Sequence, residues 1–144
     1  MKRPIAILLG LLIFTGGISL RAETDEEVEA HRSVLDLTGA FSNEGFRLRD
    51  GHWVGVVNPK ERTLIAVNLY AGNQYWFAAA ANEKAKKIAV DLFDENGKQL
   101  VTESYNSGEK AAAGFSPQSS GQYFVSLGVL EGESTTFCLV YSYK

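Results

Sequence analysis

Few side chains in this sequence belong to the types that perform catalysis or hold metals. Among 144 residues there are two histidines, His31 and His52, and a single cysteine, Cys138. One cysteine excludes an internal disulfide framework and any multi-cysteine zinc or iron–sulfur site. The sequence contains neither a Gly-x-Ser-x-Gly nucleophile elbow nor a His-Glu-x-x-His zinc motif. We therefore expect no enzyme, no catalytic residue, no metal and no cofactor.

The three candidate residues each have a simpler interpretation. Cys138 lies between Phe137 and Leu139 in an apolar run, which favours a buried small hydrophobe over a reactive thiol. His52 follows a tight-turn signal and precedes Trp53, which is typical of a surface or edge-strand position. No third residue close in sequence to either histidine completes a catalytic or metal site.

An acidic cluster provides the only candidates for calcium. Asp91, Asp94, Glu95 and Asn96 offer oxygen ligands, which calcium prefers. The spacing lacks the Asp-x-Asp-x-Asn alternation of a dedicated calcium loop. We favour a solvated turn in which Asp and Asn side chains bond their own backbone.

Aromatic residues could form a stacking platform for sugars or peptides. We select Trp53, Trp76 and Tyr105 as possible ligand contacts, while noting that most aromatics in a small sandwich serve packing. Further candidates are Tyr70, Tyr75, Tyr123, Tyr141 and Tyr143. Nucleic acid is not an expected partner, because the net charge is −3. The small basic cluster of Lys84, Lys86 and Lys87 is interpreted as a solvated loop.

The first 22 residues are typical of a secretory signal peptide. A basic start at Lys2 and Arg3 precedes an apolar run of about 14 residues, which is short for a membrane-spanning helix. Cleavage after Ala22 would remove three basic residues and no acidic one, so the net charge would become −6. We expect a periplasmic or extracellular protein with no membrane attachment after cleavage.

Hydrophobic periodicity indicates one short helix followed by strands. Thr24 and Glu27 form a capping-box pattern, and apolar residues at helical spacing predict a helix over residues 25–37, ended by Gly39. From Phe46 onward apolar residues recur at about every second position, which is typical of strands. Turn signals separate about nine short segments of this kind. Residues 78–87 are interpreted as a loop with one helical turn, and 99–105 as a strand. This pattern predicts an all-β, antiparallel sandwich.

Residues 64–143 resemble the bacterial pre-peptidase C-terminal domain family. The similarity rests on four segments in order: Leu69–Phe77, Val90–Leu100, Phe115–Val125 and Thr136–Val140. The resemblance implies a sandwich of jelly-roll type in an exported bacterial protein. That family's domain usually follows a secreted peptidase, which is not found in this sequence, so the usual role is not carried over.

The expected organisation is therefore a signal peptide (1–22), a helix with its lead-in (23–45) and a sandwich (46–144). We expect an exported, non-enzymatic binding or accessory module whose partner is a protein, peptide or glycan. Two alternatives stay open. One is a small secreted hydrolase with an unfamiliar site, and the other is an envelope subunit that assembles through a sheet edge.

Overall fold

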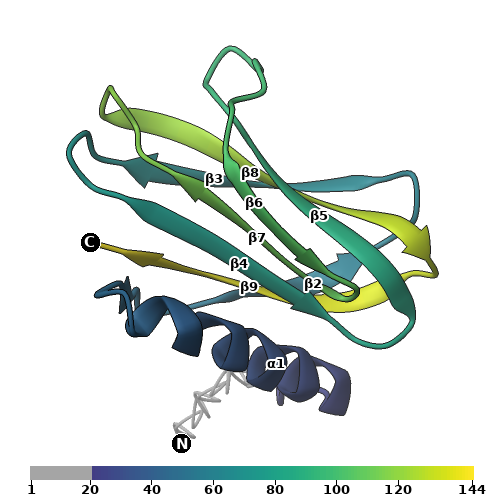
Figure 1. Cartoon of the computed structure of the whole chain (residues 1–144). Coiled ribbons are helices and arrows are strands. Elements are labelled where there is room, and N and C mark those ends of the chain that lie inside the picture. Colours follow the sequence, from purple (N-terminus) through teal and green to yellow (C-terminus); the bar gives the residue numbers. More distant parts are fainter. Residues whose placement is uncertain (1–20) are drawn as a thin grey trace, which may run out of the picture.

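The structure, a computed structural model, describes residues 21–144 (Figure 1). The expected signal peptide falls almost wholly on residues 1–20, outside the described residues. One helix precedes nine strands in the described part of the chain. In order, the elements are α1 (Asp25–Ser42), β1 (Arg47–Leu48), β2 (Trp53–Val57), β3 (Arg62–Leu69), β4 (Tyr75–Ala81), β5 (Ala85–Phe93), β6 (Glu103–Ser107), β7 (Lys110–Phe115), β8 (Gly121–Gly132) and β9 (Thr135–Tyr143).

The strands form two antiparallel sheets. The larger has the order β1-β9-β4-β7-β6, with β2 also paired to β9, and the smaller has the order β3-β8-β5. The sheets face one another across a core to which both contribute, including Phe77 and Leu139 from the larger sheet and Ile88 and Leu127 from the smaller. The predicted antiparallel, two-sheet architecture is confirmed at this level.

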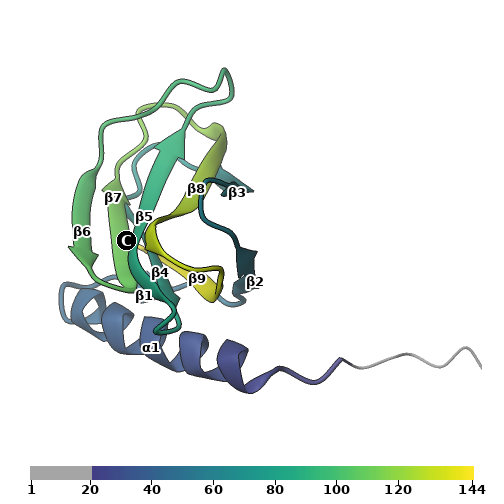
Figure 2. The same cartoon turned by 90° about the vertical axis from the view of Figure 1, so that its right-hand side faces the viewer.

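Helix α1 covers the outer face of the larger sheet (Figure 2). The Thr24 hydroxyl accepts a hydrogen bond from the Glu27 backbone N–H, and the Glu27 carboxylate accepts one from the Thr24 N–H. This confirms the predicted capping box. Ala30 and Val34 then pack in a second apolar cluster against Ala78 and Val140 of the sheet. The chain thus has three layers: a helix and two sheets.

The helix continues five residues beyond its predicted end at residue 37. Gly39 does not stop it, because this glycine does not adopt the positive φ of a helix-ending glycine, and a glycine inside a helix costs only about 1 kcal/mol. Phe41, two residues later, is buried against the sheet and supplies contacts that hold the last turn.

Two predicted segments differ from the structure. Residues 78–87 form no helical turn: β4 continues to Ala81 and β5 begins at Ala85. Sheet pairing on both sides of β4 outweighs the helix preference of alanine. The strand expected over residues 99–105 starts later, since β6 begins at Glu103 and Gln99 makes only an isolated bridge to Phe93.

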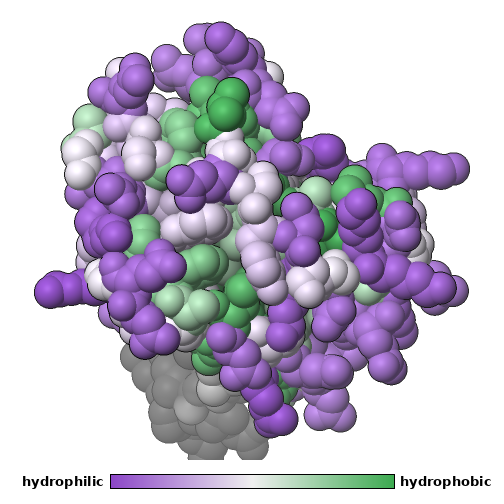
Figure 3. Space-filling view, in the orientation of Figure 1, coloured by the Kyte–Doolittle hydropathy of each residue, from purple (hydrophilic) through white to green (hydrophobic). Residues whose placement is uncertain are grey.

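The face of the molecule in Figure 3 is mostly hydrophilic, with hydrophobic side chains appearing in its middle. Apolar residues scattered on a polar surface are normal in monomeric proteins, so this face alone indicates no extended docking surface. Within residues 21–144, no helix combines the length and apolar character required to cross a bilayer.

Candidate functional site

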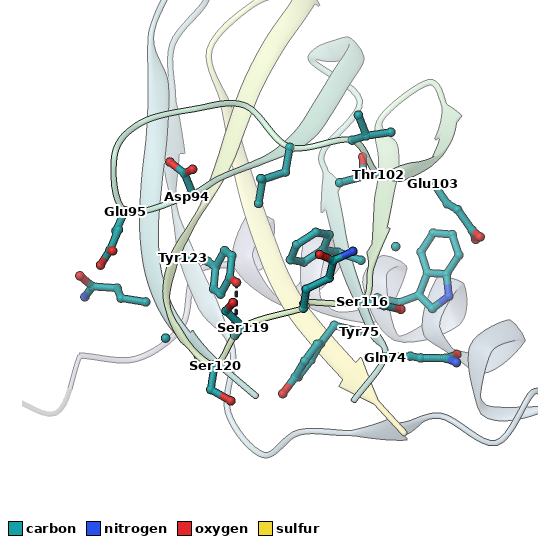
Figure 4. Close-up of a pocket in the computed structure, with 18 of the residues that line it drawn as sticks. Gln74, Tyr75, Asp94, Glu95, Thr102, Glu103, Ser116, Ser119, Ser120 and Tyr123 are labelled. Atoms are coloured by element: carbon teal, nitrogen blue, oxygen red, sulfur yellow. Dashed lines mark hydrogen bonds between the residues drawn. The ribbon is translucent and has the colours of Figure 1, made fainter. Parts of the chain in front are cut away.

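A cleft of about 760 Å³ opens at one end of the two sheets. The segment between β5 and β6, from Asp94 to Thr102, forms one wall, and the segment between β7 and β8, from Ser116 to Ser120, forms another (Figure 4). Loops at the end of a rigid two-sheet scaffold are common binding positions, since the sheets fix the loop ends.

Aromatic rings line the cleft. Phe115 and Tyr123 meet edge to face, with 5.5 Å between ring centroids. The Tyr123 hydroxyl donates a hydrogen bond of 2.6 Å to the Ser119 carbonyl oxygen, which ties the ring to the loop (Figure 4). Trp76, in β4, also lines the cleft, together with the buried rings of Tyr75 and Phe46. The partly exposed rings of Trp76, Phe115 and Tyr123 can stack on a sugar or an aromatic side chain.

The rim of the cleft is polar and acidic. Its carboxylates are Asp94, Glu95 and Glu103, and Gln74 and Gln118 contribute amides. No lysine, arginine or histidine is among the described residues that line it. The electrostatic character of the cleft therefore disfavours phosphates, sulfated sugars and other anions.

The three aromatics selected from the sequence occupy different places. Trp76 lies at the cleft, where its ring packs over Gly114 and against Phe41. Trp53 packs instead on Tyr141, with 6.0 Å between ring centroids and the Arg49 guanidinium nearby. Tyr105 is an exposed residue of β6. The structure does not bring these three rings together.

Phe115 was not selected from the sequence as a ligand contact. It and Tyr123 bracket a Ser-, Gln- and Gly-rich loop, and an aromatic at each end of a polar loop is the signal that points to such a site.

A second, smaller hollow of about 330 Å³ shares Tyr75 with the cleft. Tyr70, Tyr141 and Tyr143 line it together with Arg49. Burial raises the pKa of the Tyr141 phenol, an effect that the positive charge of Arg49 partly offsets. The phenol is therefore neutral and available as a hydrogen-bond donor near neutral pH.

Two of the four calcium candidates, Asp91 and Asp94, use their carboxylates to bind other parts of the protein. Asp94 accepts hydrogen bonds from the backbone N–H groups of Asn96 and Lys98, both at 2.9 Å, which is the self-bonded turn expected from the sequence. Asp91 pairs with Arg62 at 2.9 Å on the smaller sheet. Asp94, Glu95 and Asn96 line the cleft, whereas Asp91 does not.

Both histidines lie close to the cysteine, although the chain separates them widely. His31 of α1 and His52, just before β2, stack with 4.2 Å between ring centroids and 24° between planes. The nearest ligand atoms of His31, His52 and Cys138 all lie within 4.8 Å of one another. His52 Nε2 also lies 3.3 Å from the Glu23 carboxylate. The sequence did not indicate this convergence, because the three residues share no motif.

Cys138 is buried beneath α1 on the outer face of β9. Burial raises the pKa of its thiol to about 12, and the negative charge of Glu23 adds to this shift. The free thiol is therefore protonated at neutral pH, unlike the lowered-pKa thiolates of cysteine nucleophiles.

Comparison with known protein families found no match for this chain, and comparison with curated proteins found no match either.

Proposed function

We propose that this chain is an exported, non-enzymatic binding module, a β-sandwich of jelly-roll type whose end cleft holds a neutral or cationic saccharide or peptide. The acidic, aromatic-lined cleft is the observation that carries the proposal. Its rings provide stacking surfaces, and its carboxylates and amides provide hydrogen-bond partners. A neutral sugar or a peptide bearing lysine or arginine matches this combination.

Export and the jelly-roll assignment rest on the sequence. The basic and apolar start supports a signal peptide, and the similarity to pre-peptidase C-terminal domains supports a jelly-roll scaffold in an exported protein. A binding role also agrees with the cleft's position between loops, away from the two histidines.

The direct experiment probes arrays of neutral, cationic and anionic saccharides and peptides with the secreted protein. Titration calorimetry then measures the affinity of each ligand found. We expect neutral or cationic ligands whose affinity falls at least about tenfold in Gln118→Ala or Phe115→Ala. Glu109→Gln is the matched control, because Glu109 does not line the cleft.

Two results would contradict the proposal. One is an absence of any ligand across both arrays, and the other is a ligand whose affinity the cleft variants leave unchanged. A preference for anionic ligands would also contradict the acidic character of the rim.

One observation bears on the hydrolase alternative. His52 lies within 3.3 Å of the Glu23 carboxylate, a pairing that a general base would need. Neither histidine lines either of the two hollows described above, so neither hollow would place a substrate beside this pair. A hydrolase screen in which an activity disappears in His52→Gln would favour this alternative.

The envelope-subunit alternative depends on free sheet edges. β6 is an edge of the larger sheet, and all five of its residues are exposed. Exposed backbone groups of this kind can pair with another chain. A strict monomer in size-exclusion chromatography would argue against self-assembly through this edge.

A further inference from the structure

Three residues of metal-ligating type, from three separate elements, meet at the seam between α1 and the larger sheet. His31 belongs to α1, His52 directly precedes β2, and Cys138 lies in β9. They form the only group of three histidine, cysteine, aspartate or glutamate side chains this close together among residues 21–144. The group lies outside the cleft assigned to ligand binding.

We propose that His31, His52 and Cys138, with Glu23 as a fourth ligand, form a binding site for one divalent transition-metal ion, of which Zn²⁺ is the best match.

The distances are close to those that zinc requires. Zinc–nitrogen bonds of about 2.0 Å and zinc–sulfur bonds of about 2.3 Å, arranged as a tetrahedron, place ligand atoms ~3.3–3.7 Å apart. The three ligand atoms already lie within 4.8 Å of one another. A contraction of about an ångström, achieved by rotating the two imidazoles out of their stack, would bring them into the coordination range.

Glu23 contacts one member of the set, His52, and its carboxylate must move toward Cys138 to become the fourth ligand, since Glu23 is outside the group whose ligand atoms all lie within 4.8 Å of one another. Its Oε1 atom lies 3.3 Å from His52 Nε2, and its negative charge acts on the Cys138 thiol. A carboxylate there supplies an oxygen ligand and compensates the charge of the ion. With one thiolate and one carboxylate, a divalent ion would leave the site electrically neutral, which suits its partial burial.

The backbone framework holds the ligands on one face. Cys138 pairs with Val54 of β2 on one side and with Ala80 of β4 on the other. Cross-strand partners share a face of the sheet, so Val54 lies on the same face as Cys138, which belongs to the apolar cluster beneath α1. His52 directly precedes β2, and its ring stacks on His31 of α1. The Thr24–Glu27 capping box fixes the first turn of α1, and His31 follows one turn later.

The site is reachable from solvent. The side chains of Glu23 and His52 are 46% and 27% exposed, whereas Cys138 is buried. An ion can therefore contact the carboxylate and imidazole first and the sulfur last. The neighbouring carboxylates are already engaged, since Glu27 serves the capping box and Glu26 pairs with Lys84.

The donor set selects the class of ion. Two imidazoles and a thiolate suit zinc, cobalt, nickel and copper, whereas calcium and magnesium require oxygen ligands. On binding, the Cys138 thiol transfers its proton to solvent and its sulfur lone pair to the ion, while the neutral imidazoles each donate a nitrogen lone pair. One proton is released per ion, so affinity falls as the pH falls.

Four protein ligands would make this a closed site of the structural kind, which has no open position for substrate. Its effect would be to fasten the start of α1 to β2 and β9.

The test uses the full-length gene, so that any processing is native, with a C-terminal affinity tag free of histidine and cysteine. Metal-free protein is titrated with Co²⁺ and with Zn²⁺. We expect one ion per chain, a thiolate-to-cobalt charge-transfer band in the near ultraviolet, and a higher unfolding temperature with Zn²⁺ but not with Mg²⁺ or Ca²⁺. Zinc should displace the cobalt band.

His52→Gln and Cys138→Ser should each weaken zinc affinity at least about tenfold, and Cys138→Ser should abolish the charge-transfer band. Arg32→Gln is the matched control, because Arg32 is an exposed neighbour of His31 outside the cluster.

The cobalt spectrum of the unaltered protein decides the question even if a variant fails to fold. No charge-transfer band, or zinc stabilisation unchanged in both variants, would overturn the proposal.

Discussion

The indole ring of Trp76 lies almost parallel to the phenyl ring of Phe41, with 4.7 Å between centroids and 8° between planes. Phe41 is in the last turn of α1, and Trp76 is in β4 and also lines the cleft. One aromatic stack therefore joins the docked helix to the candidate binding site. A change in the docking of α1 should affect the cleft through Trp76.

Replacing Phe41 with alanine tests how much this aromatic stack contributes to stability. The substitution removes the stack and leaves a cavity between α1 and the sheet, so we expect the free energy of unfolding to fall by about 3 kcal/mol. Urea denaturation followed by tryptophan fluorescence measures this change. Leu35→Ala is the control, because Leu35 is an exposed apolar residue of the same helix. Equal losses in the two variants would show that the stack contributes nothing special.

Gly114 is required by the position of the Trp76 ring. A Cβ atom at residue 114 would lie 2.9 Å from Cζ2 of Trp76, closer than real contacts allow. Gly114→Ala must therefore displace the indole, and we expect a loss of about 1–3 kcal/mol of stability together with altered tryptophan fluorescence. Gly39→Ala provides the contrast, because nothing lies within 4 Å of its added Cβ and alanine favours the helix. A fully stable Gly114→Ala variant with unchanged fluorescence would contradict this assignment.

The parts of the fold that could be predicted from the sequence are those determined by residues close together in the chain. Thr24 and Glu27 mark the start of α1, since a capping box needs only four consecutive residues. Alternation likewise indicated strands such as β3 (Arg62–Leu69), where exposed and buried positions follow one another. Both signals are contained within one element.

The parts that the sequence did not reveal depend on contacts between elements. The end of β4, which falls in the segment expected as a loop, is one example. Ala78 and Ala80 face the helix and Ala79 faces the core, so alanine on both faces leaves no hydrophobic alternation there. The histidine and cysteine cluster needs both the docking of α1 and the pairing of Val54 with Cys138. Neither register nor docking is encoded in a local motif.

The hydroxyl of Tyr123 should stabilise the cleft loop. Tyr123→Phe keeps the ring that meets Phe115 but removes the hydrogen bond to the Ser119 carbonyl. We expect a loss of about 0.5–1.5 kcal/mol in stability and faster amide hydrogen exchange in residues 116–121. Tyr105→Phe is the matched control, because no hydrogen bond of the Tyr105 hydroxyl is described and its ring is exposed. Unchanged exchange in the loop of Tyr123→Phe would contradict the tethering role.

The ion pair between Glu26 and Lys84 should give helix docking a dependence on pH. The hydrogen bond and charge of Lys84 lower the pKa of the Glu26 carboxyl, and Thr136 adds a further hydrogen bond. In return, Glu26 raises the pKa of the Lys84 amine. The carboxylate contributes stability above its usual pKa of 4.5, which is lost as the pH falls through its lowered value. The amine contributes stability below 10.5, which is lost as the pH rises through its raised value.

The difference in stability between the unaltered protein and Glu26→Gln should therefore be largest near neutral pH and should shrink in acid and in strong base. It should also shrink with added salt, since the pair is exposed. Denaturant titrations across the pH range, with Glu29→Gln as a control on the same helix, measure this difference. A difference independent of pH and salt would show that Glu26 acts through packing.

The buried thiol of Cys138 should destabilise the metal-free protein in alkali. Its pKa is raised from 9.0 to about 12 in the fold, mainly by burial, so the unfolded chain loses the proton first as the pH rises. Stability is therefore lost between pH 9 and 12, by at most about 1.4 kcal/mol per pH unit.

The variant Cys138→Ala lacks this ionisation. The phenol of Tyr141, whose pKa is also raised by burial, is present in both proteins, so its effect on the difference in stability cancels. The stability advantage of the unaltered protein over Cys138→Ala, measured by urea denaturation with a chelator and a thiol reductant, should shrink as the pH rises from 9. A constant advantage across that range would mean that the thiol ionises equally readily in the folded and unfolded chains, and that α1 does not keep water from Cys138.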